Sequence, residues 1–122
     1  MTRHEDLPYL KHIMDAINDI EISVRNLSKE EFKKAKDTRD ATVRRIEIIG
    51  EASKNVSKEL KRNHPEIEWS KVAGARDVMI HAYFKVDWDV IWDIIKKDIP
   101  DLKKKIESIL PEIEVKDKRT TK

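Results

Sequence analysis

The chain of 122 residues is long enough for one domain with a real hydrophobic core, and its 26 basic and 24 acidic side chains leave a formal charge of only +2. This balance excludes nucleic-acid binding through overall positive charge, so any RNA contact must come from a local patch. The sequence has no cysteine, which excludes disulfides and thiolate metal sites, and no apolar run of the roughly 20 residues that span a bilayer, so we expect a cytoplasmic protein without a membrane segment.

Apolar residues recur at intervals of three and four near the start of the chain, which is the spacing of an amphipathic helix. They predict a first helix from about residue 6 to residue 26. The next segment, "SKEE", has capping-box spacing between Ser28 and Glu31. It predicts a second, short helix that runs through Ala35.

A third and longer helix is predicted to begin near residues 37–40 and to continue to "NHP", residues 63–65, where the proline stops it. Gly50 lies inside this helix, where glycine costs about 1 kcal/mol relative to alanine. The missing side chain is useful only if a neighbouring structure comes close. We therefore expect another helix to approach Gly50.

Two further helices are predicted in the second half of the chain. Ser70 is placed to cap a fourth helix that runs through Phe84, and Asp87 is placed to cap a fifth. The three-and-four rhythm then continues across Pro100, which suits either a kink or a new helix with proline in its first turn.

No segment alternates polar and apolar residues for long enough to predict a strand. The predicted fold is therefore an all-α antiparallel bundle of four main helices plus a short one. We expect a single domain over residues 1–110. Residues 111–122 contain too few apolar side chains to fold alone, which predicts a mobile polar tail.

The fourth predicted helix contains "RDVMIHAYF", residues 76–84, with three polar groups of chemical interest. At about 100° per residue, Tyr83 lies roughly 20° from Arg76 around the helix, whereas His81 lies about 140° away. Asp77 and His81 form a separate pair one turn apart. One straight helix cannot turn Arg76 and His81 toward one atom, so a second surface would have to close the site, and a homodimer would supply it.

These residue types suit RNA cleavage without a metal or other cofactor. Histidine can take a proton near neutral pH, so His81 could deprotonate a ribose 2′-hydroxyl, with Asp77 fixing its tautomer. Arg76 could stabilise the charge that develops on the phosphate. The alternative is that these groups are only the solvated face of a highly charged helix, which is the commoner case for such spacings.

The surrounding sequence, with "RRIEIIGEASKNVSKEL", "HPEIEWSKVAGARD" and "RDVMIHAYFKVDWDVIWDIIKKDIPDL" in this order, resembles the HepT-type toxins of the HEPN-domain ribonuclease superfamily. The similarity covers about residues 7–110. The family motif R-x(4)-H-x-Y falls on Arg76, His81 and Tyr83. The usual "YFGVD" appears here with Lys85 in place of its glycine.

The resemblance implies a HEPN-like bundle that dimerises with the active cleft at the interface. Arg76 and His81 would be the catalytic pair of the toxin in a type VII toxin–antitoxin system. A nucleotidyltransferase antitoxin (MntA-type) would inactivate the toxin by adenylylating Tyr83.

Two features of this chain bear on RNA binding. Asp77, often asparagine in the superfamily, would repel a phosphate, whereas Lys85 adds positive charge; Lys85, Arg44 and Arg45 are the candidate RNA contacts. A non-catalytic alternative stays open, in which a helical dimer binds a nucleotide or serves only as the partner of a nucleotidyltransferase.

Overall fold

The computed structural model describes residues 5–120, which are helical with short connections and contain no strand. The bundle consists of four long helices: α1 (Leu7–Val24), α3 (Lys36–Lys54), α5 (Trp69–Phe84) and α7 (Ile99–Thr120). Three short helices lie between them: α2 (Lys29–Lys34), α4 (Lys58–Asn63) and α6 (Trp88–Asp93). The all-α prediction is confirmed. None of the described helices is both long and apolar enough to cross a membrane.

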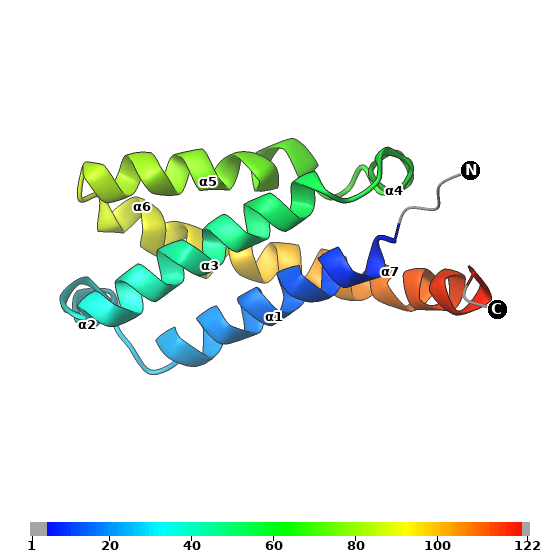
Figure 1. The fold of residues 1–122 in the computed structure, drawn as a ribbon. Helices are drawn as coiled ribbons and strands as arrows, with labels where there is room; N and C mark the ends of the chain where they lie inside the picture. Colours follow the sequence, from blue (N-terminus) through cyan, green and yellow to red (C-terminus); the bar gives the residue numbers. More distant parts are fainter. Residues whose placement is uncertain (1–4, 121–122) are drawn as a thin grey trace.

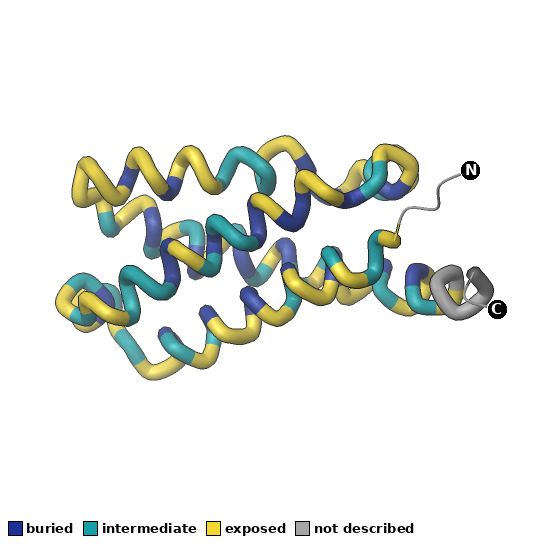
Figure 2. Tube along the Cα trace, viewed as in Figure 1, coloured by how far each residue is buried: buried dark blue, intermediate teal, exposed yellow. Residues whose placement is uncertain are grey.

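The third helix is the centre of the packing, because α3 lies between α1 on one side and α5 on the other (Figure 1). Helix α7 packs against α1 and completes the bundle. The short helices α2 and α6 lie at the same end of the molecule as the C-terminal end of α5. Most of the outer surface of α5 is exposed (Figure 2), so this helix is covered mainly from the side of α3.

The core is built from the apolar positions that the three-and-four spacing predicted. The large side chains with almost no exposed surface include Leu10, Ile13, Ile17 and Ile20 of α1, Ile46 and Ile49 of α3, Phe32, Met79, Ile91 and Ile106. Burying one such side chain contributes roughly 1.5–3 kcal/mol. Two tryptophans support the bundle as well: the ring of Trp92 packs on that of Phe32, with 5.2 Å between the centroids, and Trp69 is buried.

Two of the predicted caps are present. The Ser28 hydroxyl accepts a hydrogen bond from the Glu31 amide at 3.1 Å, and Glu31 accepts one from the Ser28 amide at 2.9 Å. These bonds to Ser28 lower the pKa of the Glu31 carboxyl. Asp87 accepts from the Val90 amide at 3.3 Å and caps α6. The predicted Ser70 cap is wrong, because α5 already begins at Trp69.

The predicted third helix is interrupted, since α3 ends at Lys54 and α4 begins at Lys58. Ser57 caps α4 by accepting from the Leu60 amide at 3.1 Å. Asp6 in turn accepts from the Ser57 amide at 2.8 Å and from its hydroxyl at 2.7 Å. The break therefore depends on a carboxylate at the start of α1, which helical periodicity could not indicate.

The fifth predicted helix stays helical across Pro100, but it changes pitch. After α6, residues Ile94–Asp98 form a π-helical segment, η1, and the Ile99 amide donates to the carbonyl of Ile94. Pro100 then lies in the first turn of α7, where its missing N–H is tolerated. The wider turn also relieves the clash between a proline ring and the preceding helical turn.

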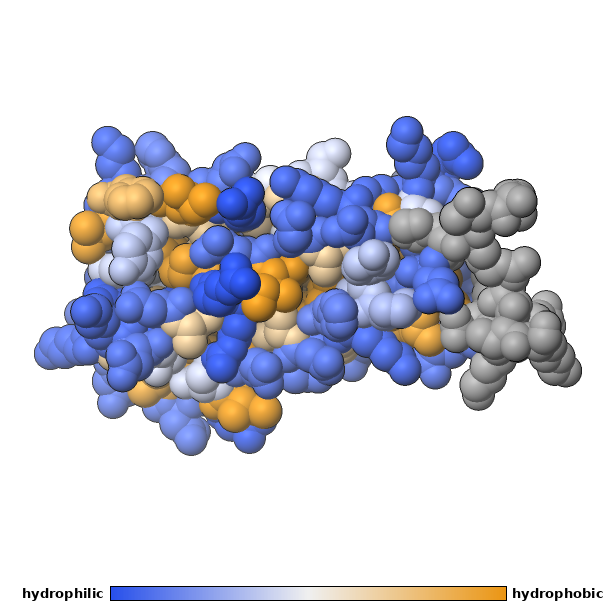
Figure 3. Space-filling model, viewed as in Figure 1, coloured by the Kyte–Doolittle hydropathy of each residue, from blue (hydrophilic) through white to orange (hydrophobic). Residues whose placement is uncertain are grey.

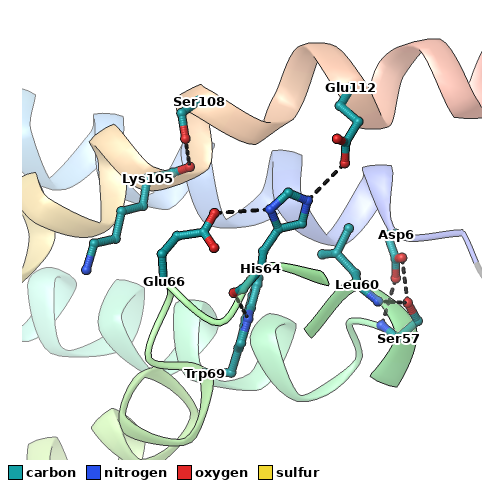
Figure 4. A network of polar contacts seen from close by, with 9 residues as sticks. All are labelled: Asp6, Ser57, Leu60, His64, Glu66, Trp69, Lys105, Ser108 and Glu112. Carbon is teal, nitrogen blue, oxygen red and sulfur yellow. Dashed lines mark hydrogen bonds and ion pairs between the residues drawn. The ribbon is translucent and has the colours of Figure 1, made fainter. Parts of the chain in front are cut away.

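Helix α7 continues past the predicted boundary at residue 110, through Pro111 to Thr120, and Ile113 is buried. His64 holds this part of α7: its Nε2 lies 2.9 Å from Glu112 and its Nδ1 lies 3.1 Å from Glu66 (Figure 4). Burial alone would lower the pKa of His64, but the hydrogen bonds to Glu112 and Glu66 raise it. The last two residues of the predicted tail, 121–122, lie outside the described residues.

Candidate active site

The motif helix α5 lies against α3 at a glycine. A Cβ atom added to Gly50 would lie 3.2 Å from the carbonyl oxygen of Ala73 and 3.3 Å from that of Val72. These are backbone atoms of α5, and the amide nitrogen of Arg76 lies 3.5 Å away. The expected close approach at Gly50 is confirmed. This contact sets how closely α5 packs on α3, and it thereby sets the position of the Arg76 backbone.

The motif side chains stand on the outside of α5, while Met79 and Ala82 anchor the helix in the core. Arg76 and His81 are exposed, and Tyr83 is 37% exposed. Arg76 and Tyr83 both line hollows against α3, whereas His81 lines neither of these hollows. The helical angles predicted this separation. Within one chain, Arg76 and His81 do not face a common point.

Arg76 forms the α5 side of a groove with a volume of about 510 Å³. Helix α1 contributes Tyr9 and His12 to this groove, and α3 with the turn after it contributes Arg44, Glu47, Ile48, Glu51 and Asn55. Figure 3 shows strongly hydrophilic side chains over the middle of α3 and α5 on this face, with apolar surface beside them. The groove thus has both polar and apolar walls, and the motif arginine is one of its lining residues. The fold gives His12 neighbours from α3 and α5 that its position in α1 does not reveal.

The three basic residues predicted to contact RNA lie in different surroundings. Arg44 is exposed and lines the groove with Arg76. Arg45 points toward α1, where it donates to the Ser23 hydroxyl at 3.1 Å, so it connects two helices. Lys85 is exposed at the end of α5. Asp77 is also exposed and forms no hydrogen bond or ion pair with Arg76 or His81 in the described chain.

Tyr83 lines a second, smaller hollow with Asp40 and Glu47 of α3 and with Ile80 and Phe84 of its own helix. Its ring stands edge-on to Trp88, with 5.6 Å between the centroids. The guanidinium of Arg39 covers Trp88 at 4.3 Å. The tyrosine ring is therefore held by packing, although part of its surface stays accessible.

Apolar side chains surround the motif on the uncovered side of α5. Val78, Ile80, Phe84 and Val86 are 45%, 36%, 79% and 63% exposed. Apolar surface is visible over the end of α5 nearest to α6 (Figure 3). Ile80 and Phe84 line the same hollow as Tyr83, whereas Val78 lines another hollow with residues of η1 and α7. Exposed apolar side chains beside a polar motif are typical of a surface that another molecule covers.

The end of the motif helix has an unusual backbone. Lys85 has an ordinary backbone conformation with φ −83°, but the next residue, Val86, has the left-handed φ of 56°. The Asp87 amide donates to the Ala82 carbonyl at 2.8 Å and the Val86 amide donates to the Tyr83 carbonyl at 3.1 Å. This is a Schellman motif, in which glycine normally takes the left-handed position. A β-branched residue there costs roughly 1–3 kcal/mol of strain directly beside the site.

Comparison with known proteins gives a consistent result. The family model described as "Ribonuclease HepT-like" matches residues 13–109. A probable ribonuclease HepT of Thermococcus cleftensis is 49% identical over 106 residues, which cover 87% of this chain and 94% of the relative. A putative RNase of Caldanaerobacter subterraneus subsp. tengcongensis is 43% identical over 84% of this chain and 92% of its own length. A putative RNase of Methanocaldococcus jannaschii is 37% identical over 98% of this chain and 99% of the relative. No solved structure gives a significant match.

Proposed function

The chain belongs to the HepT-like ribonuclease family, and from this premise we propose that it is the RNA-cleaving toxin of a type VII toxin–antitoxin pair in the cytoplasm. The observation that carries the proposal is the placement of Arg76 and His81. Both side chains are exposed on α5, they face different directions, and uncovered apolar residues lie around them. This arrangement suits a site completed by a second molecule.

The proposed chemistry needs no metal. His81 takes the proton from a ribose 2′-hydroxyl, and the resulting oxygen attacks the adjacent phosphorus. The bond from phosphorus to the 5′-oxygen breaks, that oxygen takes up a proton, and a 2′,3′-cyclic phosphate remains. Arg76 stabilises the negative charge that the phosphate gains during attack. Asp77 supports His81 in this proposal.

A second copy of the chain is the proposed source of the missing surface. If two α5 helices face each other, Ile80 and Phe84, which lie on the same side of α5, are buried between them, and Arg76 of one copy comes near His81 of the other. Obligate interfaces of this kind are more apolar than the general surface, as this patch is. The dimer thus provides the convergence that a single helix cannot.

Control by a nucleotidyltransferase antitoxin is proposed to act at Tyr83. The hollow beside Tyr83 shares Glu47 with the groove that contains Arg76. An adenylyl group on the Tyr83 hydroxyl would bring a negative phosphate and a bulky base next to the RNA site. Both effects would oppose binding of the substrate phosphate.

The test is RNA cleavage in the presence of a chelator, with analysis of the product ends. We expect the wild-type chain to leave 2′,3′-cyclic phosphates, and His81→Ala and Arg76→Ala each to lose roughly a hundredfold or more in rate. Arg62→Ala on α4 is a suitable control, because Arg62 is exposed and lies outside the groove. Equal inertness of wild type and His81→Ala, with nucleotide binding retained, would favour the non-catalytic alternative.

A further inference from the structure

The groove beside Arg76 is lined by aromatic rings as well as by charged side chains. We infer that it is a subsite for one RNA nucleotide next to the cleaved phosphate, with Tyr9 and His12 stacking on the base and Glu47 and Glu51 selecting its hydrogen-bonding edge. This inference rests on the proposed RNA cleavage, and it assigns substrate recognition to α1 and α3, outside the motif helix.

Size and position are the first argument. The volume of about 510 Å³ lies within the range of roughly 300–1,000 Å³ that small-molecule sites occupy. Arg76 is part of the wall, so a phosphate held by its guanidinium places the attached nucleoside in the groove.

The rings of α1 are the second argument. Tyr9 and His12 lie one helical turn apart, with ring centroids 6.5 Å apart and an angle of 89° between the ring planes. A base stacked on one ring therefore stands perpendicular to the other, and perpendicular edge-to-face arrangements are favourable for aromatic rings. Base stacking on aromatic side chains is a common way of holding unpaired RNA.

The charges of the groove are the third argument. Arg44 and Arg76 share the groove with Glu47 and Glu51, and neither arginine forms an ion pair with either glutamate in the described chain. The arginines suit the phosphates on either side of the nucleotide. The carboxylates accept hydrogen bonds but repel phosphate, so they favour a base edge that donates.

The carboxylates also predict a base preference. Guanine presents two neighbouring donors on its Watson–Crick edge, N1–H and the 2-amino group, which match the two oxygens of one carboxylate. Uracil presents one donor between two acceptors, and these acceptors face the carboxylate unfavourably. We therefore expect guanine to bind most tightly in the groove and uracil least tightly.

The test uses fluorescently labelled RNA pentamers that carry a 2′-deoxyribose at the cleavage position, so that binding is measured without reaction. The base next to this position is G, A, C or U. We expect G to bind at least several-fold more tightly than U, and Glu47→Gln or Glu51→Gln to reduce this ratio. We expect His12→Ala to weaken all four probes by roughly fivefold or more.

Matched variants separate stacking from folding. Tyr9 packs partly against the core, so Tyr9→Phe, which keeps the ring, should bind as wild type does, whereas Tyr9→Ala should bind weakly. Lys11→Ala is the control on α1, because Lys11 is exposed and outside the groove. In cleavage assays, His12→Ala should raise KM and leave kcat nearly unchanged.

Two outcomes would overturn the inference. If His12→Ala and Tyr9→Ala cleave RNA as fast as the wild type and with the same KM, the groove is not a nucleotide subsite, although the proposed nuclease activity stands. If the G and U probes bind equally tightly, or if neither glutamate variant changes the ratio of their affinities, the carboxylates do not select the base. If the wild-type chain does not cleave RNA, this result counts against the proposed function and not against the subsite, because the binding assay does not require cleavage.

Discussion

The contact between α3 and α5 can be tested with the two glycines of the chain, Gly50 and Gly74. Both lie inside helices, so alanine at either position gains about 1 kcal/mol of helix propensity. Their surroundings differ. A Cβ at Gly74 would meet no atom within 4 Å, whereas a Cβ at Gly50 would lie 3.2 Å and 3.3 Å from two backbone carbonyl oxygens of α5.

The expected free energies of unfolding follow from this difference. Gly74→Ala should stabilise the protein by about 1 kcal/mol. Gly50→Ala gains the same propensity, but it must displace the α5 backbone, and overpacking of this kind typically costs about 1–3 kcal/mol. The net change at Gly50 is therefore a destabilisation of roughly 0–2 kcal/mol. The two variants should differ by about 1–3 kcal/mol, or roughly 4–12 °C in Tm for a chain of this size.

Urea unfolding at one fixed protein concentration measures both changes, because self-association would otherwise shift the midpoint. RNA cleavage by the folded variants gives a second measurement. Gly50→Ala should lose activity, since the displaced segment includes the backbone of Arg76, while Gly74→Ala should retain it. If Gly50→Ala stabilises as much as Gly74→Ala, the two helices are not in tight contact and this reasoning is refuted.

Three further changes test other parts of the structure. Val86→Gly should stabilise the chain by about 1 kcal/mol in urea unfolding, because glycine adopts the left-handed backbone without strain; a loss of stability would argue against that conformation. The raised pKa of His64 predicts that its contribution to stability is fully present below its unfolded pKa of about 6.5 and disappears as pH rises through the folded pKa. The pH dependence of unfolding should lose this step in His64→Gln and show a smaller step in Glu112→Gln, where the bond to Glu66 remains. Phe84→Asp should weaken the proposed dimer by roughly a hundredfold to ten-thousandfold in sedimentation equilibrium, since each copy would lose about 1.5–3 kcal/mol of burial. Ile22→Asp, at an exposed apolar residue on α1, should not weaken it; an unchanged dimer in Phe84→Asp would place the interface elsewhere.

The sequence predicted the features that depend on neighbours along the chain. The spacing of apolar residues located α1, α3, α5 and α7, and the spacing of Ser28 and Glu31 located the start of α2. The angular positions of Arg76, His81 and Tyr83 on α5 also follow from helix geometry alone. The structure agrees with them, because a helix fixes side-chain direction through hydrogen bonds between residues four apart.

Other features were decided by residues far apart in the sequence. The end of α3 depends on Asp6, which accepts hydrogen bonds from Ser57 across 51 positions. The continuation of α7 beyond Pro111 accompanies the contact between Glu112 and His64, 48 positions away. The low apolar content of residues 111–122 predicted a tail there, because local composition does not show that Ile113 is buried against the rest of the bundle.

The candidate site divides in the same way. The amino-acid sequence by itself determined which residues could carry the chemistry, since the motif lies within one helix and its order and spacing are local. Only the tertiary structure decided that Tyr9 and His12 of α1 share a groove with Arg76, that Arg44 faces this groove and that Arg45 does not. The physical reason is that a groove is formed by the packing of separate helices, and the close approach at Gly50, which sets that packing, appears in the sequence only as a missing side chain.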